Sequence, residues 1–561
     1  MLQRGHSDTF RVGADGWLAG AAFLALAVAS TWPLAGNLTS SLPGDYGDPL
    51  FVTWVMAWVA RHLTRALTGD FGALAAMWDA PIFMPEANTL AFSEHFVGQA
   101  VQALPIYWLT SNPLLAYNLV FLATFVLSGL GAYLLVRELT GSRLGGLVAG
   151  VLFAVNDFRT ASLSHLHTLS AQWVPLACLG LWHFARSGSR RALAFAALSV
   201  LALNASSGYY MLYCDPLIGA FGLVVLARHT AWRTRRGWIA LAVAGVAVAM
   251  VQLPLVLPYL ELQRVHQFAR TRAELELYSY SLDLYRSRLP YLAPMLALAA
   301  ASGLGWRSKG VGLRWAIGFF AGAGILGWWL SLGPVPRLNG APVGLPGLYT
   351  LLFDYVPGYS GLRVAGRVAV VLLTALAVLG GIGAALLARR AGRAGASLAV
   401  VVAAAHLYLQ WMGPIPLDSP IHGAGVNQAP AYLRPAQDAP LIYRFLATTP
   451  PSAVLAEFPF GDPGYELRYM YFGLMHERRL LNGYSGFFPL SYRNRAALLK
   501  DPPAAPEAAW AALAPATHVL VHTGAWDDSR RTTIGEWLEG HGARRLAARD
   551  GAVLWQLPAS R

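Results

Sequence analysis

Apolar segments about as long as a membrane span recur through most of this sequence, separated by short polar stretches. A helix needs about 20 mostly apolar residues to cross the hydrocarbon core of a bilayer. Of the 561 residues, 56% are hydrophobic and 13% are charged, whereas soluble proteins carry about 25% charged residues. The sequence therefore predicts a mainly α-helical membrane protein that crosses the bilayer many times.

Basic residues determine the predicted direction of the spans. The net charge of +13 is compatible with nucleic-acid binding, but the basic residues form short clusters between apolar segments. This is the positive-inside pattern of membrane proteins, so we predict no nucleic-acid partner and place every cluster in the cytoplasm. The clusters are Arg137 with Arg143, Arg186 with Arg190 and Arg191, Arg228 with Arg233, Arg235 and Arg236, Arg307 with Lys309 and Arg314, and Arg389 with Arg390 and Arg393.

This placement requires about eleven spans. Arg4 and Arg11 precede the first apolar segment, which has no convincing cleavage site, so we expect an uncleaved first span and a cytoplasmic N-terminus. The predicted spans are residues 17–34, 115–136, 144–155, 170–184, 192–203, 210–226, 238–257, 289–305, 315–332, 368–387 and 398–412.

Two further segments are predicted to be juxtamembrane helices on the outer face. Residues 48–67 are apolar at helical spacing but carry Arg61, His62 and Arg65, which is typical of a helix on the membrane surface. Residues 96–109 are short and contain Pro105, so we predict a re-entrant or interfacial segment. The alternative, a full span there, would place Arg137 and Arg143 outside.

Beyond residue 413 the sequence predicts a different kind of domain. We divide the chain into a transmembrane domain, residues 1–413, and an extracytoplasmic soluble α/β domain, residues 414–561. The strands expected there are 454–460, 479–484, 518–522 and 552–557, with amphipathic helices at 507–513 and 533–541. The two cysteines, Cys178 and Cys214, lie in apolar surroundings and predict neither a disulfide framework nor a thiolate metal site.

The first outer loop carries two acids directly after the first span. The stretch SSLPGDYGDPLFVTWVMAW contains Asp45 and Asp48 between turn-forming residues and a Trp-rich helix. Asp48 before Pro49 has the pattern of a helix N-cap, and that structural role alone would explain it. Ionisable groups at a membrane boundary are otherwise candidates for function. Because Asp45 is not at a helix N-cap position, we expect its carboxylate to be the one that is free to face an acceptor.

The other predicted outer loops also concentrate polar residues. The cytoplasmic loops, by contrast, are short and basic and contain no glycine-rich phosphate-binding loop. Any chemistry is therefore expected on the outer face, with a donor that reaches it in lipid-linked form. The candidate substrate-binding residues are Glu94, His95, Asp157, Arg159, His165, His167, Gln172, Tyr209, Tyr210, Arg363 and Arg367.

The chain resembles the GT-C-type membrane glycosyltransferases over nearly its whole length. The resemblance is to bacterial proteins grouped with the dolichyl-phosphate-mannose-protein mannosyltransferases and arabinosyltransferases. It is carried by GDYGDPLFVTWVMAW, ANTLAFSEHFVGQAVQALPIYWLTSNPLLAYN, YLLVRELTGSR, HLHTLSAQWVPL, YSGLRVAGRVAVV, FPFGDPGYELRYMYFGLMH and NGYSGFF. The mannosyltransferase branch has an adjacent Asp-Glu pair, whereas here Asp45 and Asp48 are separated, which leaves open which of them is a base.

The resemblance implies a GT-C-like bundle that transfers a sugar from a polyprenyl-phosphate donor with inversion at the sugar carbon. Asp45 or Asp48 would take the proton of an acceptor hydroxyl, an effect worth about 10²- to 10⁴-fold. Arg363 and Arg367 would hold the leaving phosphate, unless they only extend towards lipid headgroups. His165 and His167 would orient an acceptor, unless they only bond loop backbone.

The expected partners are membrane lipid, the lipid-linked sugar, and a glycan, lipid or protein acceptor at the bacterial plasma membrane. No cofactor is predicted; carboxylates and histidines are able to ligate a divalent metal, but their spacing does not require one. The competing interpretation is a non-catalytic GT-C relative, transporter or scaffold in cell-envelope polysaccharide or lipid assembly. A transporter should carry charged residues or broken helices near the bilayer midplane, and the predicted spans contain few.

Overall fold

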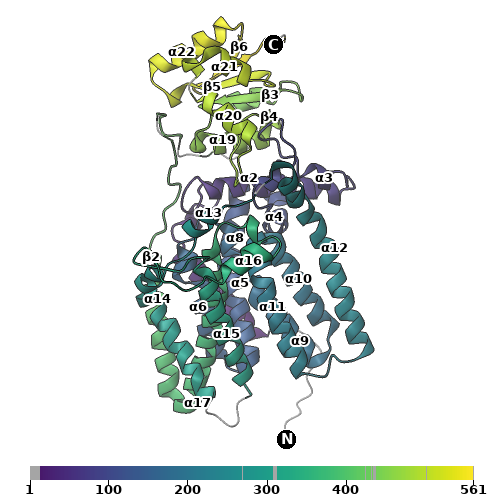
Figure 1. The fold of residues 1–561 in the computed structure, drawn as a ribbon, viewed down its shortest axis with the longest axis vertical. Helices are drawn as coiled ribbons and strands as arrows, with labels where there is room; N and C mark the ends of the chain where they lie inside the picture. The colour runs from purple at the N-terminus through teal and green to yellow at the C-terminus, as the bar shows by residue number, and fades with distance from the viewer. Residues whose placement is uncertain are drawn as a thin grey trace.

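The computed structural model describes residues 13–267, 269–306, 312–423, 425–430, 433, 438–500 and 502–559. A bundle of long helices forms one end of the molecule, and a small mixed sheet with its helices forms the other (Figure 1). Several short helices lie between these two parts. The predicted cytoplasmic residues Arg4, Arg11, Arg307 and Lys309 lie outside the described residues.

A helix coincides with each of the predicted spans. Among the described residues, four helices are long and apolar enough to cross a membrane: α5, α11, α12 and the helix over Ala365–Leu409. The number of helices that actually cross therefore stays a prediction. The helices are α1 (Ala14–Ser30), α5 (Pro113–Thr140), α6 (Arg143–Ala154), α9 (Trp173–Ser187), α10 (Arg190–Ser206), α11 (Gly208–Arg228), α12 (Arg235–His266), α14 (Leu282–Ala301), α15 (Arg314–Ser331) and α17 (Ala369–Leu409).

The last helix of the bundle, α17, supplies two of these segments because it reverses at Gly392. This glycine has φ 56° and ψ −130° inside an otherwise helical run, a conformation open to glycine and costly for other residues. After it, the chain folds back so closely that a Cβ on Gly395 would collide with the Leu387 carbonyl oxygen. Further on, His406 Nε2 lies 2.7 Å from the Val155 carbonyl oxygen, just beyond the end of α6.

The basic turns gather at one end of the bundle. The Arg389 guanidinium donates to the Thr140 carbonyl oxygen, and Arg390 donates to that of Leu304 at 3.3 Å. Arg137 and Arg143 both lie beside the Asp15 carboxylate, at 3.0 and 3.3 Å. The start of α1, the turn from α5 to α6 and the turn within α17 therefore share one face, as the positive-inside pattern requires.

The opposite end of the bundle carries short elements and loops. Here lie η1 (Leu34–Gly36), α3 (Ala73–Ala76), η2 (Thr89–Phe92), α7 (Asp157–Thr160), α8 (Leu166–Leu169), α13 (Arg272–Leu277), β1 (Arg337–Leu338), β2 (Ala341–Pro342), α16 (Tyr349–Tyr355), η4 (Tyr359–Gly361) and η5 (Ala365–Val368), whereas η3 (Ser302–Gly305) continues α14.

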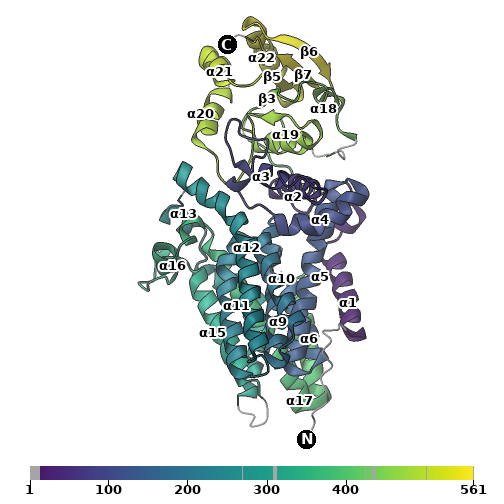
Figure 2. The same ribbon diagram turned by 90° about the vertical axis from the view of Figure 1, so that its right-hand side faces the viewer.

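The helix expected on the membrane surface is instead largely buried. Helix α2 (Asp48–Leu67) has the predicted bounds, but most of its residues are buried, including Trp54. It lies crosswise between the bundle and the C-terminal sheet region, above α4 (Val97–Thr110) (Figure 2). One of its basic residues contacts protein here: Arg61 pairs with Glu477 and donates to the Leu474 carbonyl oxygen at 2.7 Å.

The C-terminal region is a five-stranded sheet of order β4-β3-β5-β7-β6. Strands β4, β3 and β5 are parallel, and β7 is antiparallel to both β5 and β6. The four predicted strands are present; β6 was not predicted. The strands are β3 (Val454–Phe458), β4 (Arg479–Leu480), β5 (His518–His522), β6 (Arg544–Arg549) and β7 (Ala552–Gln556), with helices α18 (Leu441–Leu446), α19 (Pro463–His476), α20 (Leu490–Leu499), α21 (Pro506–Ala512) and α22 (Asp528–Gly540), and 3-10 turns η7 (Pro502–Ala504) and η8 (Thr523–Ala525).

This region is joined to the acidic loop, on the side that the sequence predicts. The Leu42 amide donates to Asp418 Oδ1 at 2.8 Å, and the Tyr46 amide donates to the Ser419 carbonyl oxygen at 2.9 Å. One hydrophobic core runs from α2 and α5 through the first outer loop into the sheet. The two parts are therefore packed as one body here, and the boundary at residue 414 stays a prediction.

Candidate functional site

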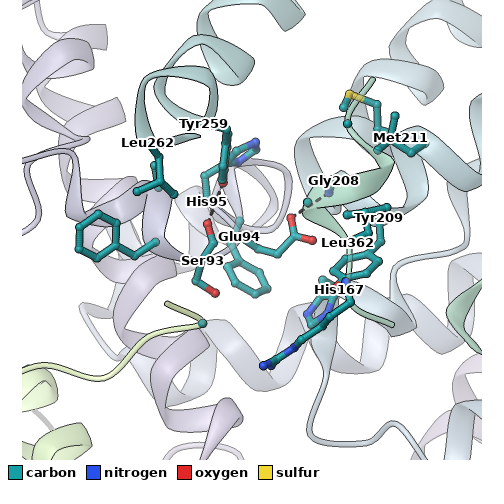
Figure 3. Close-up of a pocket in the computed structure, with 18 of the residues that line it drawn as sticks. Ser93, Glu94, His95, His167, Gly208, Tyr209, Met211, Tyr259, Leu262 and Leu362 are labelled. Atoms are coloured by element: carbon teal, nitrogen blue, oxygen red, sulfur yellow. Dashed lines mark hydrogen bonds between the residues drawn. The ribbon is translucent and has the colours of Figure 1, made fainter. Parts of the chain in front are cut away.

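A cavity of about 340 Å³ lies where the bundle, the loops predicted to lie outside and the C-terminal region meet. Eight of the predicted site residues line it: Asp48, Glu94, His95, His165, His167, Tyr209, Arg363 and Arg367. They come from segments up to about 300 residues apart in the chain, as expected when folding assembles a site from loops on a rigid scaffold. Figure 3 shows Glu94, His167 and Tyr209 converging on this space.

Asp48 faces the cavity and does not cap α2. Gly47 is the residue before the helix, and no side chain caps its N-terminus. One Asp48 oxygen, Oδ2, lies 3.3 Å from His165 Nε2. The other, Oδ1, accepts a hydrogen bond from the Tyr484 hydroxyl at 3.4 Å. The prediction that Asp48 acts as an N-cap is therefore wrong.

Asp45 is held inside its own loop. Its Oδ1 accepts from the Gly47 amide at 2.7 Å, and its Oδ2 accepts from the Ser164 hydroxyl at 3.0 Å. Asp45 is absent from the cavity lining. The expectation that its carboxylate is the one free to face an acceptor is wrong, because the turn that the sequence predicted uses that side chain to hold Gly47.

A second acid, Glu94, lines the cavity in a partly buried position. Its Oε2 accepts from the Gly208 amide at 2.8 Å (Figure 3). Burial raises the pKa of Glu94, and the Gly208 N–H and the nearby Arg367 partly oppose that rise. Next to it, burial lowers the pKa of His95 to about 4, and His95 Nδ1 accepts from the Val97 amide at 3.1 Å.

The two histidines of the next loop both reach the cavity. Neither ring nitrogen of His167 has a hydrogen-bond partner among the described residues. Burial lowers the pKa of His167, and Arg367 lowers it further. The ring is therefore a neutral imidazole with one donor and one acceptor available. Burial also lowers the pKa of His165, while Asp48 opposes the shift.

Two arginines at the cavity have no ion-pair partner in the part of the chain that the structure describes. The Arg367 guanidinium lies over the Tyr209 ring, 4.5 Å from its centroid, and Arg363 lies over Tyr278 at 5.3 Å. Neither guanidinium has a hydrogen bond or ion pair with a described residue. Two positive charges in a shared cavity favour an anionic ligand.

Helices α11 and α12 supply a largely apolar part of the cavity wall. Leu255, Val256 and Leu260 of α12 line it, with Met211 and Leu212 of α11. The apolar window of α12 has none of its residues buried within the chain. A carboxylate, cations and an apolar wall in one cavity give it an amphipathic character.

Besides Asp45, four predicted site residues do not line this cavity. Asp157 is paired with Arg288, and Gln172 is fully buried with both side-chain polar atoms unpartnered among described residues. Arg159 and Tyr210 line a separate cavity of about 40 Å³, which Arg367 also borders. Arg159 is held there by the Leu169 carbonyl oxygen at 2.9 Å. Sequence alone placed these residues in outer loops but gave no signal of the direction in which each points.

The sequence prediction missed several lining residues. Arg270 lies in the predicted fourth outer loop, and it donates to the Gly486 carbonyl oxygen at 3.0 Å. Tyr484 comes from the C-terminal region, within the NGYSGFF motif. Asn204 lines the cavity and donates to Asp215 on α11 at 2.8 Å. Asp215 lies inside the predicted span 210–226, and this hydrogen bond gives its carboxyl group a partner there.

Among the described residues, no three His, Cys, Asp or Glu side chains are grouped as a metal site. At the cavity, Asp48 and His165 lie side by side, and two ligands leave most of a metal's coordination to other groups.

Comparison with known proteins identifies the fold. Residues 82–287 match a domain family of unknown function, DUF6311. No curated protein matches the sequence. The structure resembles that of the arabinofuranosyltransferase AftD from Mycobacteria, with a TM-score of 0.57 and 15% identity over 98% of this chain and 42% of AftD. The chain thus spans about two fifths of the length of AftD.

Two other solved structures are similar at lower scores. The archaeal oligosaccharyltransferase AglB from Archaeoglobus fulgidus, solved with an inhibitory peptide and a dolichol-phosphate, has a TM-score of 0.46 and 12% identity over 97% of this chain and 74% of its own. ArnT from Cupriavidus metallidurans, solved with undecaprenyl phosphate, has a TM-score of 0.46 and 12% identity over 98% of this chain and 99% of its own. The fold of the chain is GT-C-like, and the chain is a membrane protein with apolar helices.

Proposed function

We propose that the chain is an inverting glycosyltransferase that moves a sugar from a polyprenyl-phosphate donor to an acceptor hydroxyl. The observation that carries the proposal is a single cavity that joins the Asp48 carboxylate, two arginines without an ion-pair partner among the described residues, and an apolar wall. A GT-C-like fold supports it, although fold alone does not fix activity. The reaction takes place at the outer face of the bacterial plasma membrane, with the N-terminus in the cytoplasm.

Arg363 and Arg367 hold the donor phosphate in this proposal. A guanidinium donates through a planar fork that matches phosphate oxygens, and such charge-assisted hydrogen bonds are among the strongest in proteins. Tyr209 supports this role, because its ring packs against Arg367 and its hydroxyl accepts from the Arg363 amide at 3.4 Å. Aromatic packing restricts the guanidinium and leaves its N–H groups for the ligand.

The prenyl chain of the donor lies along α11 and α12. Leu255, Val256 and Leu260 face the cavity, while Val246 and Met250 of the same helix α12 are exposed to the surroundings of the bundle. In the bilayer the prenyl chain is already surrounded by hydrocarbon, so this apolar wall provides a matching path for it. The arginines supply the polar contacts that set its register.

Asp48 acts as the general base. The acceptor oxygen attacks the anomeric carbon, the bond from that carbon to the phosphate oxygen breaks, and the acceptor proton passes to Asp48. The phosphate leaves with the extra negative charge, which Arg363 and Arg367 stabilise. Attack from the face opposite the leaving group inverts the anomeric carbon. Asp48 suits this role better than Asp45 because its carboxylate faces the cavity.

His167 and Glu94 bind the hydroxyls of the transferred sugar. His167 offers both ring nitrogens, and the Gly208 amide holds Glu94 Oε2 at the cavity wall. Pairing one donor and one acceptor with a sugar hydroxyl is the usual way in which buried polar groups are satisfied.

The test is sugar transfer by the purified chain in lipid nanodiscs. Polyprenyl-phosphate pentoses and hexoses are supplied as a panel, and release of the free polyprenyl phosphate is followed because it does not require a known acceptor. We expect release with at least one donor and with a mixed glycan and lipid extract as acceptor. Binding of polyprenyl phosphate without turnover of any donor would contradict the enzyme and support a non-catalytic GT-C relative in envelope assembly.

A further inference from the structure

One loop of the C-terminal region completes the wall of the cavity. Residues 482–488, here called the NG loop, follow β4 and contain the cavity-lining residues Tyr484, Ser485 and Gly486. Figure 2 shows this region seated directly over α2 and α4. The C-terminal region therefore forms part of the cavity wall, since it contributes side chains to the same cavity as Asp48.

The start of the NG loop is fixed by buried hydrogen bonds. Asn482 Oδ1 accepts from the Glu457 amide at 2.7 Å, and its Nδ2 donates to Glu466 Oε1 at 2.9 Å. The Gly483 amide donates to Glu466 Oε2 at 2.7 Å. A Cβ on Gly483 would lie 2.8 Å from the Phe83 ring, so the backbone here needs glycine. Fully satisfied buried networks of this kind hold one backbone arrangement.

From this fixed start, Tyr484 reaches the Asp48 carboxylate. Its hydroxyl donates to Asp48 Oδ1 at 3.4 Å, and its ring packs edge-on against Phe51 and Phe488, with centroids 5.8 and 6.0 Å away. Burial raises the pKa of Tyr484, and the neighbouring Asp48 charge raises it further. The hydroxyl therefore remains protonated and acts as a donor to the carboxylate.

The opposite wall supplies a second contact to the same carboxylate. His165 Nε2 lies 3.3 Å from Asp48 Oδ2, so each carboxylate oxygen faces a side chain from a different part of the chain. The NG loop also contacts an arginine of the cavity wall, because the Gly486 carbonyl oxygen accepts from Arg270 at 3.0 Å. The loop thus contacts both the Asp48 carboxylate and a cationic lining residue.

We propose that Tyr484 is a positioning residue that, together with His165, holds the Asp48 carboxylate in the orientation from which it accepts the proton of the acceptor. The C-terminal region is then a required wall of the active site. This inference rests on the proposed function. The reaction rate falls steeply when a catalytic group leaves its productive orientation. Contacts to both oxygens of the Asp48 carboxylate restrict its rotation and so keep that orientation.

The test is Tyr484→Phe, which keeps the ring and its packing and removes only the hydroxyl. We expect kcat to fall about tenfold, the effect of losing one hydrogen bond to a charged group. The KM for the donor and the melting temperature should not change. A purely structural role would lower the melting temperature and leave kcat unchanged in the folded protein.

Tyr443→Phe is the matched control. The Tyr443 hydroxyl donates to the buried Glu457 at 2.9 Å, inside the C-terminal region and away from the cavity lining. This variant should lower the melting temperature and leave kcat unchanged. An unchanged kcat in Tyr484→Phe, with an active wild type, would overturn the positioning role alone and leave the proposed function standing. A wild type that releases no polyprenyl phosphate from any donor would overturn both.

Discussion

Replacing Asp48 with asparagine distinguishes its proposed role as general base from a contribution to the stability of the fold. Asparagine at this position would keep the size of the side chain and an acceptor for the Tyr484 hydroxyl, and α2 takes no cap from this side chain. We therefore expect the free energy of unfolding to change by less than about 1 kcal/mol, as is usual for substitutions that create no cavity and no buried unpaired charge.

The expected loss of activity follows from the role of a general base. Such a group contributes about 10²- to 10⁴-fold, which corresponds to about 2.7 to 5.4 kcal/mol of activation free energy at about 1.36 kcal/mol for each factor of ten. The loss should appear in kcat with little change in the KM for the donor, because Asp48 meets the acceptor proton only in the transition state.

Asp45→Asn is the matched control in the same loop. Asparagine still accepts from the Gly47 amide through Oδ1, and its amide group donates to the Ser164 hydroxyl oxygen, so the loop keeps both contacts. Its kcat should therefore stay close to the wild-type value. The assay is release of polyprenyl phosphate under single-turnover conditions, with a thermal melt of each variant. Full kcat in Asp48→Asn, or equal losses in both variants, would refute the assignment of Asp48 as base.

Three further predictions concern the donor site, pH and topology. Arg363→Ala and Arg367→Ala should each raise the Kd for undecaprenyl phosphate about 10- to 100-fold, as expected for lost hydrogen bonds to a charged group. Arg272 pairs with Asp354 at 2.6 Å outside the cavity, so Arg272→Ala should leave that Kd unchanged. A wild-type Kd in both cavity variants would contradict the phosphate role. Burial lowers the pKa of His95 to about 4 and that of His476 to about 3, while an unfolded histidine titrates near 6.5. Only the unfolded chain therefore gains these protons at mild acid pH, and the melting temperature should fall as the pH drops from about 6.5 towards 4. His95→Asn should make the melting temperature depend less steeply on pH. Reporter fusions after Arg236 and Arg393 should be cytoplasmic and fusions after Pro414 external; a cytoplasmic C-terminal fusion would contradict the proposed orientation.

The long helices of the bundle were predictable because each follows from a local pattern. Apolar length and flanking charge located the segments of the bundle, and Asp48–Leu67 was predicted with its observed bounds. The environment of that helix was not predictable, since the same Trp-rich face suits a membrane surface or a protein interior. The covering partner, α19, lies about 400 residues further along the chain, and no local pattern reports a contact at that distance.

The site residues were predictable as a set of polar outer-loop residues, but their orientations were not. Arg363 and Arg367 line the cavity as expected, whereas Arg159 from a similar loop turns into a separate cavity. Asp45 and Asp48 both differ from expectation, because Asp45 binds the Gly47 amide and Asp48 does not cap α2. The contribution of Tyr484 follows only from the docking of the C-terminal region, a tertiary contact that the sequence does not encode locally.

The most direct measurement of the central claim is an experimental structure of the chain in nanodiscs with undecaprenyl phosphate bound. The account predicts the phosphate within hydrogen-bonding distance of the Arg363 and Arg367 guanidiniums, on the same side of the cavity as Asp48, with the prenyl chain along α12. A phosphate bound elsewhere, with Arg363 and Arg367 turned away from it, would contradict the account.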